Sequence, residues 1–321
     1  MNKTMLKRHL SIANLPTPIQ KLEADVPNLE ISVKRDDLTE FVGSGNKIRK
    51  LEYLLYDAKE RGAETVCTCG GIQSNHCRAT AFAARRLGMK PVLFLRGVEP
   101  EKGEGNLFLD NLLEAEIHWI TPEQYKERDN LMNALKLTQA EPEKFYVIPE
   151  GGSNAIGSLG YLRCVEEMIQ QTNLNDFDAI FCPVGSGGTY AGLLAGLDHF
   201  NITCDLIGIN VTLTPAEDFK SHVREILKEY ENEEFIPEKI PDEAIRIIDG
   251  YTGEAYAVPT ENGLSWIKSL MLKTGLLLDP VYTAKAFDGM IQESKKEGYK
   301  KVLFLHSGGG FGTFAYSEKL I

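Results

Sequence analysis

Short apolar runs alternate with helical patterns along most of the chain. Apolar runs typical of strands buried on both faces predict strands at residues 31–34, 65–69, 91–95, 117–120, 145–148, 179–183, 206–211, 244–248 and 301–305. Apolar residues at three- and four-residue spacing predict helices at residues 75–87, 105–115, 125–139, 157–171, 189–197, 216–230, 261–273 and 282–296. The acidic, proline-containing residues 231–243 predict a loop or linker.

This alternation determines the expected fold class. Strands that alternate with helices predict parallel sheets with helices on both faces. The strands are too many for one comfortable sheet, so we expect two α/β domains, each an open, mostly parallel sheet flanked by helices. In such sheets, ligands bind at the carboxyl ends of the strands. The glycine-rich motifs of this chain lie at such ends.

One short stretch holds the lysine most suited to chemistry. The small residues 43–46 open a tight turn, and Asn46 is the expected cap of a helix that closes at Arg61-Gly62. Lys47 then lies in the first helical turn, where the helix dipole disfavours a cation. Lys50 repels it from the same face. Lys47 is therefore either solvated or used chemically, as a nucleophile or as the imine partner of a cofactor.

A glycine-rich loop follows the predicted strand 179–183 and precedes a helix. Its residues are Gly185, Ser186, Gly187, Gly188 and Thr189. Convergent backbone N–H groups at a helix N-terminus can hold a phosphate. A dinucleotide-binding oxidoreductase would need a third glycine at position 190, which is tyrosine, and a Walker loop would need a Gly-Lys-Ser/Thr sequence. The loop is predicted to hold a phosphate of another kind, or else to be a turn packed for steric reasons.

Three further motifs offer polar or aromatic side chains. In Gln73-Ser74-Asn75-His76, N–H groups at the start of a helix suit a carboxylate, while Ser74 can cap that helix and His76 is expected to be a wall residue. Tyr282 is expected at the mouth of a sheet, as a packing residue, a ring partner or a proton donor. Ser307 can hydrogen-bond a ring nitrogen without forcing its protonation. Tyr256 is a further aromatic residue in a loop.

Composition and charge narrow the class of protein. The chain has 321 residues, 43% hydrophobic and 25% charged, as soluble globular enzymes have. A net charge of −11 argues against nucleic acid and anionic membranes as partners. The six cysteines show no zinc spacing, so no metal is expected, and Cys67 and Cys69 should share one face of a strand. Reduced thiols and the absence of a signal-peptide core predict a cytoplasmic protein.

Together the motifs resemble the pyridoxal-phosphate enzymes of fold type II, in the branch that holds D-cysteine desulfhydrase and 1-aminocyclopropane-1-carboxylate deaminase. The resemblance covers nearly the whole chain, and it rests on Gly45-Asn46-Lys47, Gln73-Ser74-Asn75, Gly185-Ser186-Gly187-Gly188-Thr189, Leu278-Asp279-Pro280-Val281-Tyr282 and His306-Ser307-Gly308-Gly309. It implies a tryptophan synthase β-like fold and a homodimer. It also implies a larger cofactor-binding domain of residues 1–45 and 157–321 and a smaller domain of residues 46–156.

The resemblance implies a role for each matched residue. Lys47 would bond covalently to pyridoxal phosphate, and Lys50 would hold its phosphate together with residues 185–189. Asn75 would hydrogen-bond the ring hydroxyl, and Ser74 with its neighbours Gln73 and Asn75 would hold the carboxylate of an amino-acid substrate. Tyr282 and Ser307 would line the cofactor ring, with Tyr256 nearby on the substrate side. The predicted catalytic residues are Lys47, Ser74 and Tyr282.

Two positions separate the branches of this family. In the deaminase, glutamate follows the last-motif tyrosine and leucine follows the final histidine, where this chain has Thr283 and Ser307. A carboxylate beside the ring nitrogen keeps it protonated, which cyclopropane opening needs more than thiolate expulsion does. The hydroxyls therefore favour β-elimination of D-cysteine to pyruvate, ammonia and sulfide.

The alternatives are the cyclopropane deaminase and a lyase acting on cysteate or another β-substituted alanine. Residues 310–313 (Gly-Phe-Gly-Thr) replace the Ala-Pro-Ala-Leu of well-known members. This difference leaves the identity of the leaving group undetermined. A sulfonate would need a cation near residue 74 or 311, and the sequence indicates none.

Overall fold

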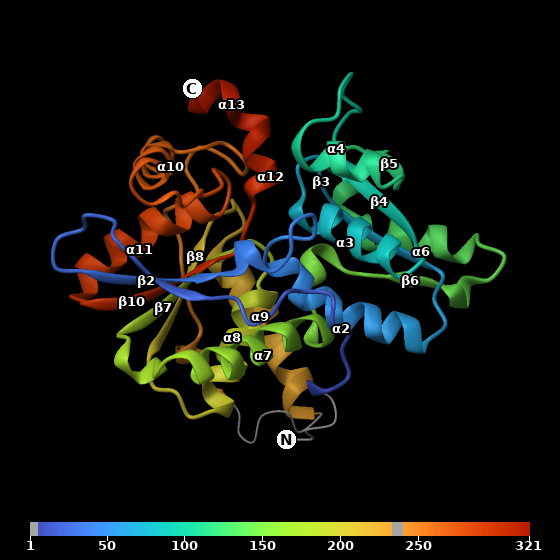
Figure 1. Ribbon diagram of the computed structural model, residues 1–321. Coiled ribbons are helices and arrows are strands. Elements are labelled where there is room, and N and C mark those ends of the chain that lie inside the picture. The colour runs from blue at the N-terminus through green and yellow to red at the C-terminus, as the bar shows by residue number, and fades with distance from the viewer. Residues whose placement is uncertain (1–5, 233–239) are drawn as a thin grey trace.

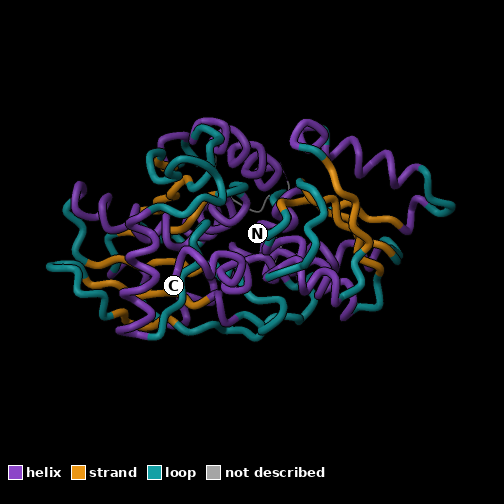
Figure 2. The backbone as a smooth tube through the Cα atoms, turned by 90° about the horizontal axis from the view of Figure 1, so that it is seen from above, coloured by secondary structure: helices purple, strands orange, loops and turns teal. Residues whose placement is uncertain are grey.

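Two separate sheets organise the chain in the computed structural model, which describes residues 6–232 and 240–321 (Figures 1 and 2). The larger sheet has the strand order β1-β2-β10-β7-β8-β9, and the smaller has β5-β4-β3-β6. The strands are β1 (Ile19–Leu22), β2 (Glu30–Arg35), β3 (Thr65–Gly71), β4 (Lys90–Arg96), β5 (Glu116–Ile120), β6 (Phe145–Val147), β7 (Ala179–Val184), β8 (Asp205–Asn210), β9 (Arg246–Ile248) and β10 (Lys301–His306). The mixed α/β class predicted from the sequence is thus confirmed.

Helices separate the strands as the apolar spacing predicts. They are α2 (Asn46–Glu60), α3 (Asn75–Arg86), α4 (Gly105–Leu112), α5 (Pro122–Lys126), α6 (Arg128–Leu137), α7 (Ala155–Gln171), α8 (Gly188–His199), α9 (Ala216–Asn232), α10 (Glu261–Thr274), α11 (Thr283–Glu297), α12 (Gly310–Thr313) and α13 (Ser317–Leu320). A 3-10 turn, η1 (Asp36–Leu38), follows β2. No helix in the described ranges is both long and apolar enough to serve as a membrane span.

The larger sheet is buried on both faces. Its strands pair in parallel except β1, which pairs antiparallel with β2. Alternate residues of β7 enter different cores: Phe181 packs with α10 and α11, whereas Cys182 packs with α7, α8 and α9. Figure 1 shows α10 and α11 on one side of this sheet and α7 and α8 on the other. Burial on two faces explains why β7 reads as a continuous apolar run.

The smaller sheet is parallel throughout. Val66 of β3 packs with α2 and α3, while Cys67 and Cys69 pack on the opposite face with Tyr125 and Met132. The prediction that these two cysteines share a face is confirmed. All four strands lie within residues 46–156, although the exact domain boundaries stay a prediction.

Several predicted elements differ from those observed. The helix predicted at 125–139 is two helices, α5 and α6. Asn46 does not cap α2, because Gly45 with φ of 103° occupies the cap position and the Asn46 side chain instead donates to Thr189. The apolar residues before Pro280 also suggest a strand end, but residues 275–279 form no strand. Most of the predicted loop 231–243 lies outside the described residues.

Candidate functional site

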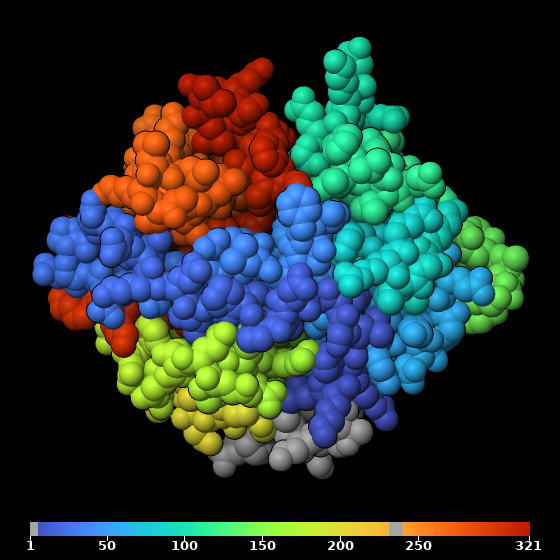
Figure 3. Space-filling view, in the orientation of Figure 1, coloured from blue at the N-terminus to red at the C-terminus, as the bar shows by residue number. Residues whose placement is uncertain are grey.

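A cavity of about 620 Å³ lies between the two sheets. Its lining comes from the carboxyl ends of β3, β4 and β6 in the smaller sheet and of β7, β8 and β10 in the larger one. Figure 3 shows a notch between the C-terminal segment and the lobe near residue 100. The predicted residues that line the cavity are Lys47, Ser74, Asn75, Gly185, Ser186, Gly187, Thr189, Tyr256, Tyr282 and Ser307. Lys50, Gln73 and Gly188 are not among the lining residues.

Lys47 and Lys50 meet at one backbone carbonyl. The Lys47 Nζ lies 3.5 Å from the oxygen of Gly151, and the Lys50 Nζ lies 3.2 Å from the same oxygen and 3.1 Å from the Oγ of Ser153. Neither amine forms an ion pair with a described residue. Two amines that meet at one carbonyl without a counter-ion make this side of the cavity suited to an anion, with Lys47 in the cavity lining and Lys50 buried behind it.

The surroundings change the acidity of both lysines. Burial lowers the pKa of Lys47 to about 8, although the charge of Glu150 opposes the shift. Burial, and then the charge of Lys47, lower the pKa of Lys50 well below its usual range. Lys47 lines the cavity, which favours chemical use over the alternative of a solvated surface lysine. The Lys47 amine can therefore be neutral near physiological pH, as a nucleophilic lysine requires.

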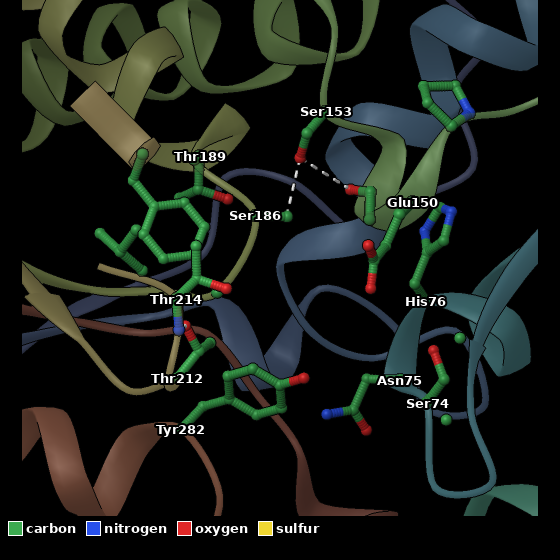
Figure 4. Close-up of a pocket in the computed structure, with 18 of the residues that line it drawn as sticks. Ser74, Asn75, His76, Glu150, Ser153, Ser186, Thr189, Thr212, Thr214 and Tyr282 are labelled. Atoms are coloured by element: carbon green, nitrogen blue, oxygen red, sulfur yellow. Dashed lines mark hydrogen bonds between the residues drawn. The ribbon is translucent and has the colours of Figure 1, made fainter. Parts of the chain in front are cut away.

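The glycine-rich loop forms a cradle beside these amines. Gly187, with φ of 79°, caps α8, so the first N–H groups of that helix remain without helical partners. Ser186 hydrogen-bonds Ser153 at 2.8 Å, and a dashed line marks this bond in Figure 4. An added side chain at Gly151 would come within 2.4 Å of the Ser186 Oγ, so only glycine permits this approach. Backbone donors and two amines together fit a phosphate.

The loop after β3 forms another wall. Ser74 caps α3 by accepting a bond from the Cys77 N–H at 3.1 Å. The Asn75 Oδ1 accepts from Asn106 at 2.9 Å, which leaves its amide nitrogen directed into the cavity (Figure 4). Gln73 turns the other way and fixes the loop through the backbone of Glu104 and Asn106. His76 lines the cavity, as predicted for a wall residue. Burial, and then the charges of Lys47 and Lys50, lower its pKa well below the usual range.

Two tyrosines close the opposite side. The hydroxyls of Tyr256 and Tyr282 are in direct contact, and their rings meet edge to face at 6.0 Å. Burial, and then Tyr256, raise the pKa of Tyr282 well above its usual range, so Tyr282 holds its proton. Lys285 of α11 anchors the Tyr256 loop by donating to the carbonyls of Thr252 at 2.6 Å and Ala255 at 3.2 Å.

Of the two positions that separate the branches of the resembled family, only one faces the cavity. Ser307 lines it, and the Ser307 hydroxyl makes no hydrogen bond to a described residue. The Thr283 hydroxyl is fully buried against Asp279, 2.7 Å from its Oδ1. Asp279 also accepts hydrogen bonds from the backbone N–H groups of residues 281–283, so its carboxylate oxygens are already bonded at the start of α11.

Several lining residues were not predicted. Glu150 binds the Tyr125 hydroxyl at 2.6 Å and Arg128 at 3.0 Å, and Arg96 lies beside the same tyrosine. Thr212 and Thr214 follow β8. Each signal was present in the sequence, since Pro149-Glu150-Gly151-Gly152 follows a strand and precedes a helix, and Arg96 is the last residue of β4. Applying the rule of carboxyl strand ends to every strand would have found them.

The fold and the site define an enzyme whose cavity, with a lysine amine and a glycine-rich loop in its lining, can hold a carbonyl cofactor with an anionic tail. The residues present fit pyridoxal phosphate, because a low-pKa amine, a backbone cradle and the free Asn75 donor stand at one cavity. The sequence profile described as "Pyridoxal-phosphate dependent enzyme" matches residues 10–308. The chain belongs to this family, and pyridoxal phosphate is its cofactor.

Similar proteins place the chain in one branch of the family. A Thermotoga maritima protein with the provisional name 1-aminocyclopropane-1-carboxylate deaminase is 49% identical over 95% of this chain and 97% of its own length. A Serratia proteamaculans D-cysteine desulfhydrase is 35% identical over 97% and 96%. An Arabidopsis thaliana bifunctional D-cysteine desulfhydrase and 1-aminocyclopropane-1-carboxylate deaminase is 38% identical over 95% and 79%.

A crystal structure described as an ACC deaminase homologue has a TM-score of 0.86 at 36% identity and covers 100% of this chain and 99% of that one. A Dictyostelium discoideum serine racemase, at 18% identity and a TM-score of 0.65 over 96% of each chain, shows the shared fold alone. The recognised family and fold class are confirmed, whereas closeness to the desulfhydrase in particular stays a prediction.

Proposed function

We propose that the protein is a β-eliminating lyase whose substrate is D-cysteine. One observation carries this proposal: the wall between Tyr282 and Ser307 offers a hydroxyl and no carboxylate. Among the described residues, the acidic side chains lining the cavity are those of Asp129, Glu150 and Asp218, which lie on other elements. Asp279, next to this wall, is buried and fully hydrogen-bonded.

A glutamate at position 283 would be longer than threonine, and the family resemblance puts it at the ring nitrogen. Thr283 is too short to extend past Asp279, to which it is bonded. Ser307 remains as the polar neighbour, and a hydroxyl leaves a ring nitrogen neutral. A weaker electron sink suffices to expel a thiolate but is poorly suited to opening a cyclopropane.

The residues divide between holding the cofactor and holding the substrate. Lys47 would bond to the cofactor's aldehyde carbon, and Lys50 with the backbone N–H groups of residues 185–189 would hold its phosphate. The Asn75 amide would donate to the ring hydroxyl. Ser74 and the exposed N–H groups after β3 would hold the substrate carboxylate. When bound, pyridoxal phosphate takes up the electron pair left at the substrate Cα.

Two side chains would move protons. The Lys47 amine, with its pKa lowered to about 8, would accept the α-proton on Nζ. Tyr282, which lines the cavity with its hydroxyl against that of Tyr256, would give its proton to the departing sulfur, and Tyr256 would hydrogen-bond the resulting phenolate. The overall reaction consumes water: D-cysteine and water give pyruvate, ammonia and hydrogen sulfide.

A second candidate is 1-aminocyclopropane-1-carboxylate deamination, which gives 2-oxobutanoate and ammonia. The names of the Thermotoga and Arabidopsis relatives favour it. Elimination from cysteate or another β-substituted alanine is a third outcome, with the same residues and a different leaving group.

A substrate panel separates these candidates. Holoenzyme is assayed with D-cysteine, L-cysteine, cysteate, D-serine, β-chloro-D-alanine and 1-aminocyclopropane-1-carboxylate, and sulfide and keto acid are measured separately. We expect sulfide and pyruvate in equal amounts from D-cysteine, and no turnover by Lys47→Ala, which lacks the amine that binds the cofactor. Keto acid from the cyclopropane substrate alone would refute the lyase assignment.

A further inference from the structure

Arg96 is a cavity cation without a protein counter-ion. It is the last residue of β4, and it lines the cavity. Across residues 6–232 and 240–321, its guanidinium makes no hydrogen bond or ion pair with the protein. By contrast, Arg128 on the same wall is paired with Glu150 at 3.0 Å. A guanidinium has five N–H donors, so Arg96 has donors available for a ligand.

Aromatic rings hold Arg96 in place without using those donors. Its Cζ lies 4.8 Å from the ring centroid of Tyr125 and 5.8 Å from that of Tyr256. Contact with ring faces orients a guanidinium while leaving its N–H edge free. Tyr125 is itself fixed by its hydrogen bond to Glu150. The two rings therefore fix the orientation of the Arg96 guanidinium in the cavity.

Arg96 lies on the predicted substrate side of the cavity. Arg96 pairs in register with Gly71 of β3, and its Nη2 lies 4.0 Å from where a side chain at Gly71 would begin. Gly71 leads directly into the loop of Ser74 and Asn75. On its other side, Tyr256 contacts Tyr282. Arg96 thus stands between the predicted carboxylate loop and the two tyrosines, on a different element from the phosphate cradle.

We propose that Arg96 determines substrate specificity by binding negative charge on the substrate's β-substituent. This inference rests on the proposed function and names its substrate class: amino acids whose Cβ carries an anionic group or one that departs as an anion. When the α-proton moves to Lys47 Nζ, the Cα–H electrons form the Cα–Cβ double bond. The Cβ–S electrons leave with sulfur, and Arg96 stabilises that thiolate until Tyr282 protonates it.

The sequence indicated no cation where a sulfonate would need one, and Arg96 supplies that cation beside residues 71–74. Cysteate consequently belongs to the same substrate class as D-cysteine. Ring opening of the cyclopropane expels no anion, so it gains nothing from Arg96. The substrate's α-carboxylate is the other negative charge that Arg96 can meet, and the experiment separates the two.

The test compares two amino acids that carry no leaving group. Holoenzyme is titrated with D-alanine and with D-aspartate, which adds a β-carboxylate, and dissociation constants are read from the cofactor absorbance. We expect Arg96→Gln to weaken D-aspartate about tenfold or more, the effect of losing one charge-assisted contact. D-Alanine should change less than about twofold. Arg96→Lys should retain part of the preference because it keeps the charge.

Controls make each outcome decisive. Arg85→Gln is the matched control, because Arg85 lies outside the cavity and donates to the carbonyls of Leu113 and Glu114; it should alter neither constant. Equal weakening of both ligands by Arg96→Gln would assign Arg96 to the α-carboxylate and overturn the proposal, as would no weakening of either. If the substrate panel refuted the lyase function, this titration would still measure the selectivity of Arg96 independently.

Discussion

At the scale of single residues, the environment of Lys47 sets its chemistry. A lysine amine ordinarily keeps its proton far above neutral pH, because its pKa in water is 10.5. Burial disfavours the charged form and lowers the pKa of Lys47 to about 8, although the charge of Glu150 opposes the shift. The site therefore supplies a neutral amine without a dedicated base.

This lowered pKa predicts the pH dependence of cofactor attachment. Because only the neutral amine attacks an aldehyde, the rate at which cofactor-free protein takes up pyridoxal phosphate should rise with pH and reach half its maximum near pH 8. Stopped-flow absorbance measures that rate. Lys47→Ala gives the background, and a midpoint near 10.5, the value of a solvated lysine, would contradict the assigned environment.

At the scale of elements, close helix contact holds α2, and with it Lys47, in place. A side chain at Gly160 of α7 would come within 2.3 Å of the Arg49 carbonyl of α2. The loop end of β10 is equally tight, since Gly308 lies against the backbone of Gly45 and the Asn46 N–H donates to the Ser307 carbonyl at 3.0 Å. Backbone-to-backbone packing of this kind requires glycine and fixes the position of Lys47, the proposed catalytic lysine.

Gly160→Ala should therefore separate α2 from α7. Overpacking of this kind costs about 1–3 kcal/mol in the free energy of unfolding, which urea denaturation measures. Gly310→Ala is the control, because nothing lies within 4 Å of a side chain added there. A Gly160 variant as stable as Gly310→Ala would show that the helices can separate at no cost.

At the scale of the whole molecule, a buried ion network ties the larger sheet to α2 and α7. Arg49 binds Asp36 of η1 at 2.8 Å and Glu167 of α7 at 2.9 Å, and Lys34 of β2 pairs with the same glutamate. Burial would raise the pKa of Asp36, but Arg49 outweighs it and holds the pKa below its usual range. The pKa of Glu167 is likewise lowered, because hydrogen bonding and charge from Arg49 overcome its burial.

Arg49→Met should cost about 3–5 kcal/mol of stability at pH 7, because it leaves two buried carboxylates with one cation. A carboxyl with a lower pKa in the folded than in the unfolded state contributes stability above the unfolded pKa, about 4, and loses it as pH falls. The wild type should therefore lose stability steeply below about pH 4, and the variant less steeply. Urea denaturation at several pH values measures the stability of the wild type and of the variant. Parallel curves of stability against pH would exclude this role of Arg49.

The homodimer stays a prediction from the family resemblance.

The sequence by itself determined the α/β class, most strands and helices, and the lysine and glycine loops of the site, because these depend on local spacing and on backbone chemistry next to strand ends. Only the tertiary structure decided that Arg96 has no counter-ion among the described residues, whereas Arg128 has one. It also decided that Ser307 lines the cavity, whereas the Thr283 hydroxyl is hydrogen-bonded to Asp279. Gln73 and Lys50, in turn, are not among the residues that line the cavity. Such facts depend on which side chains from distant elements meet, and local spacing carries no information about those meetings.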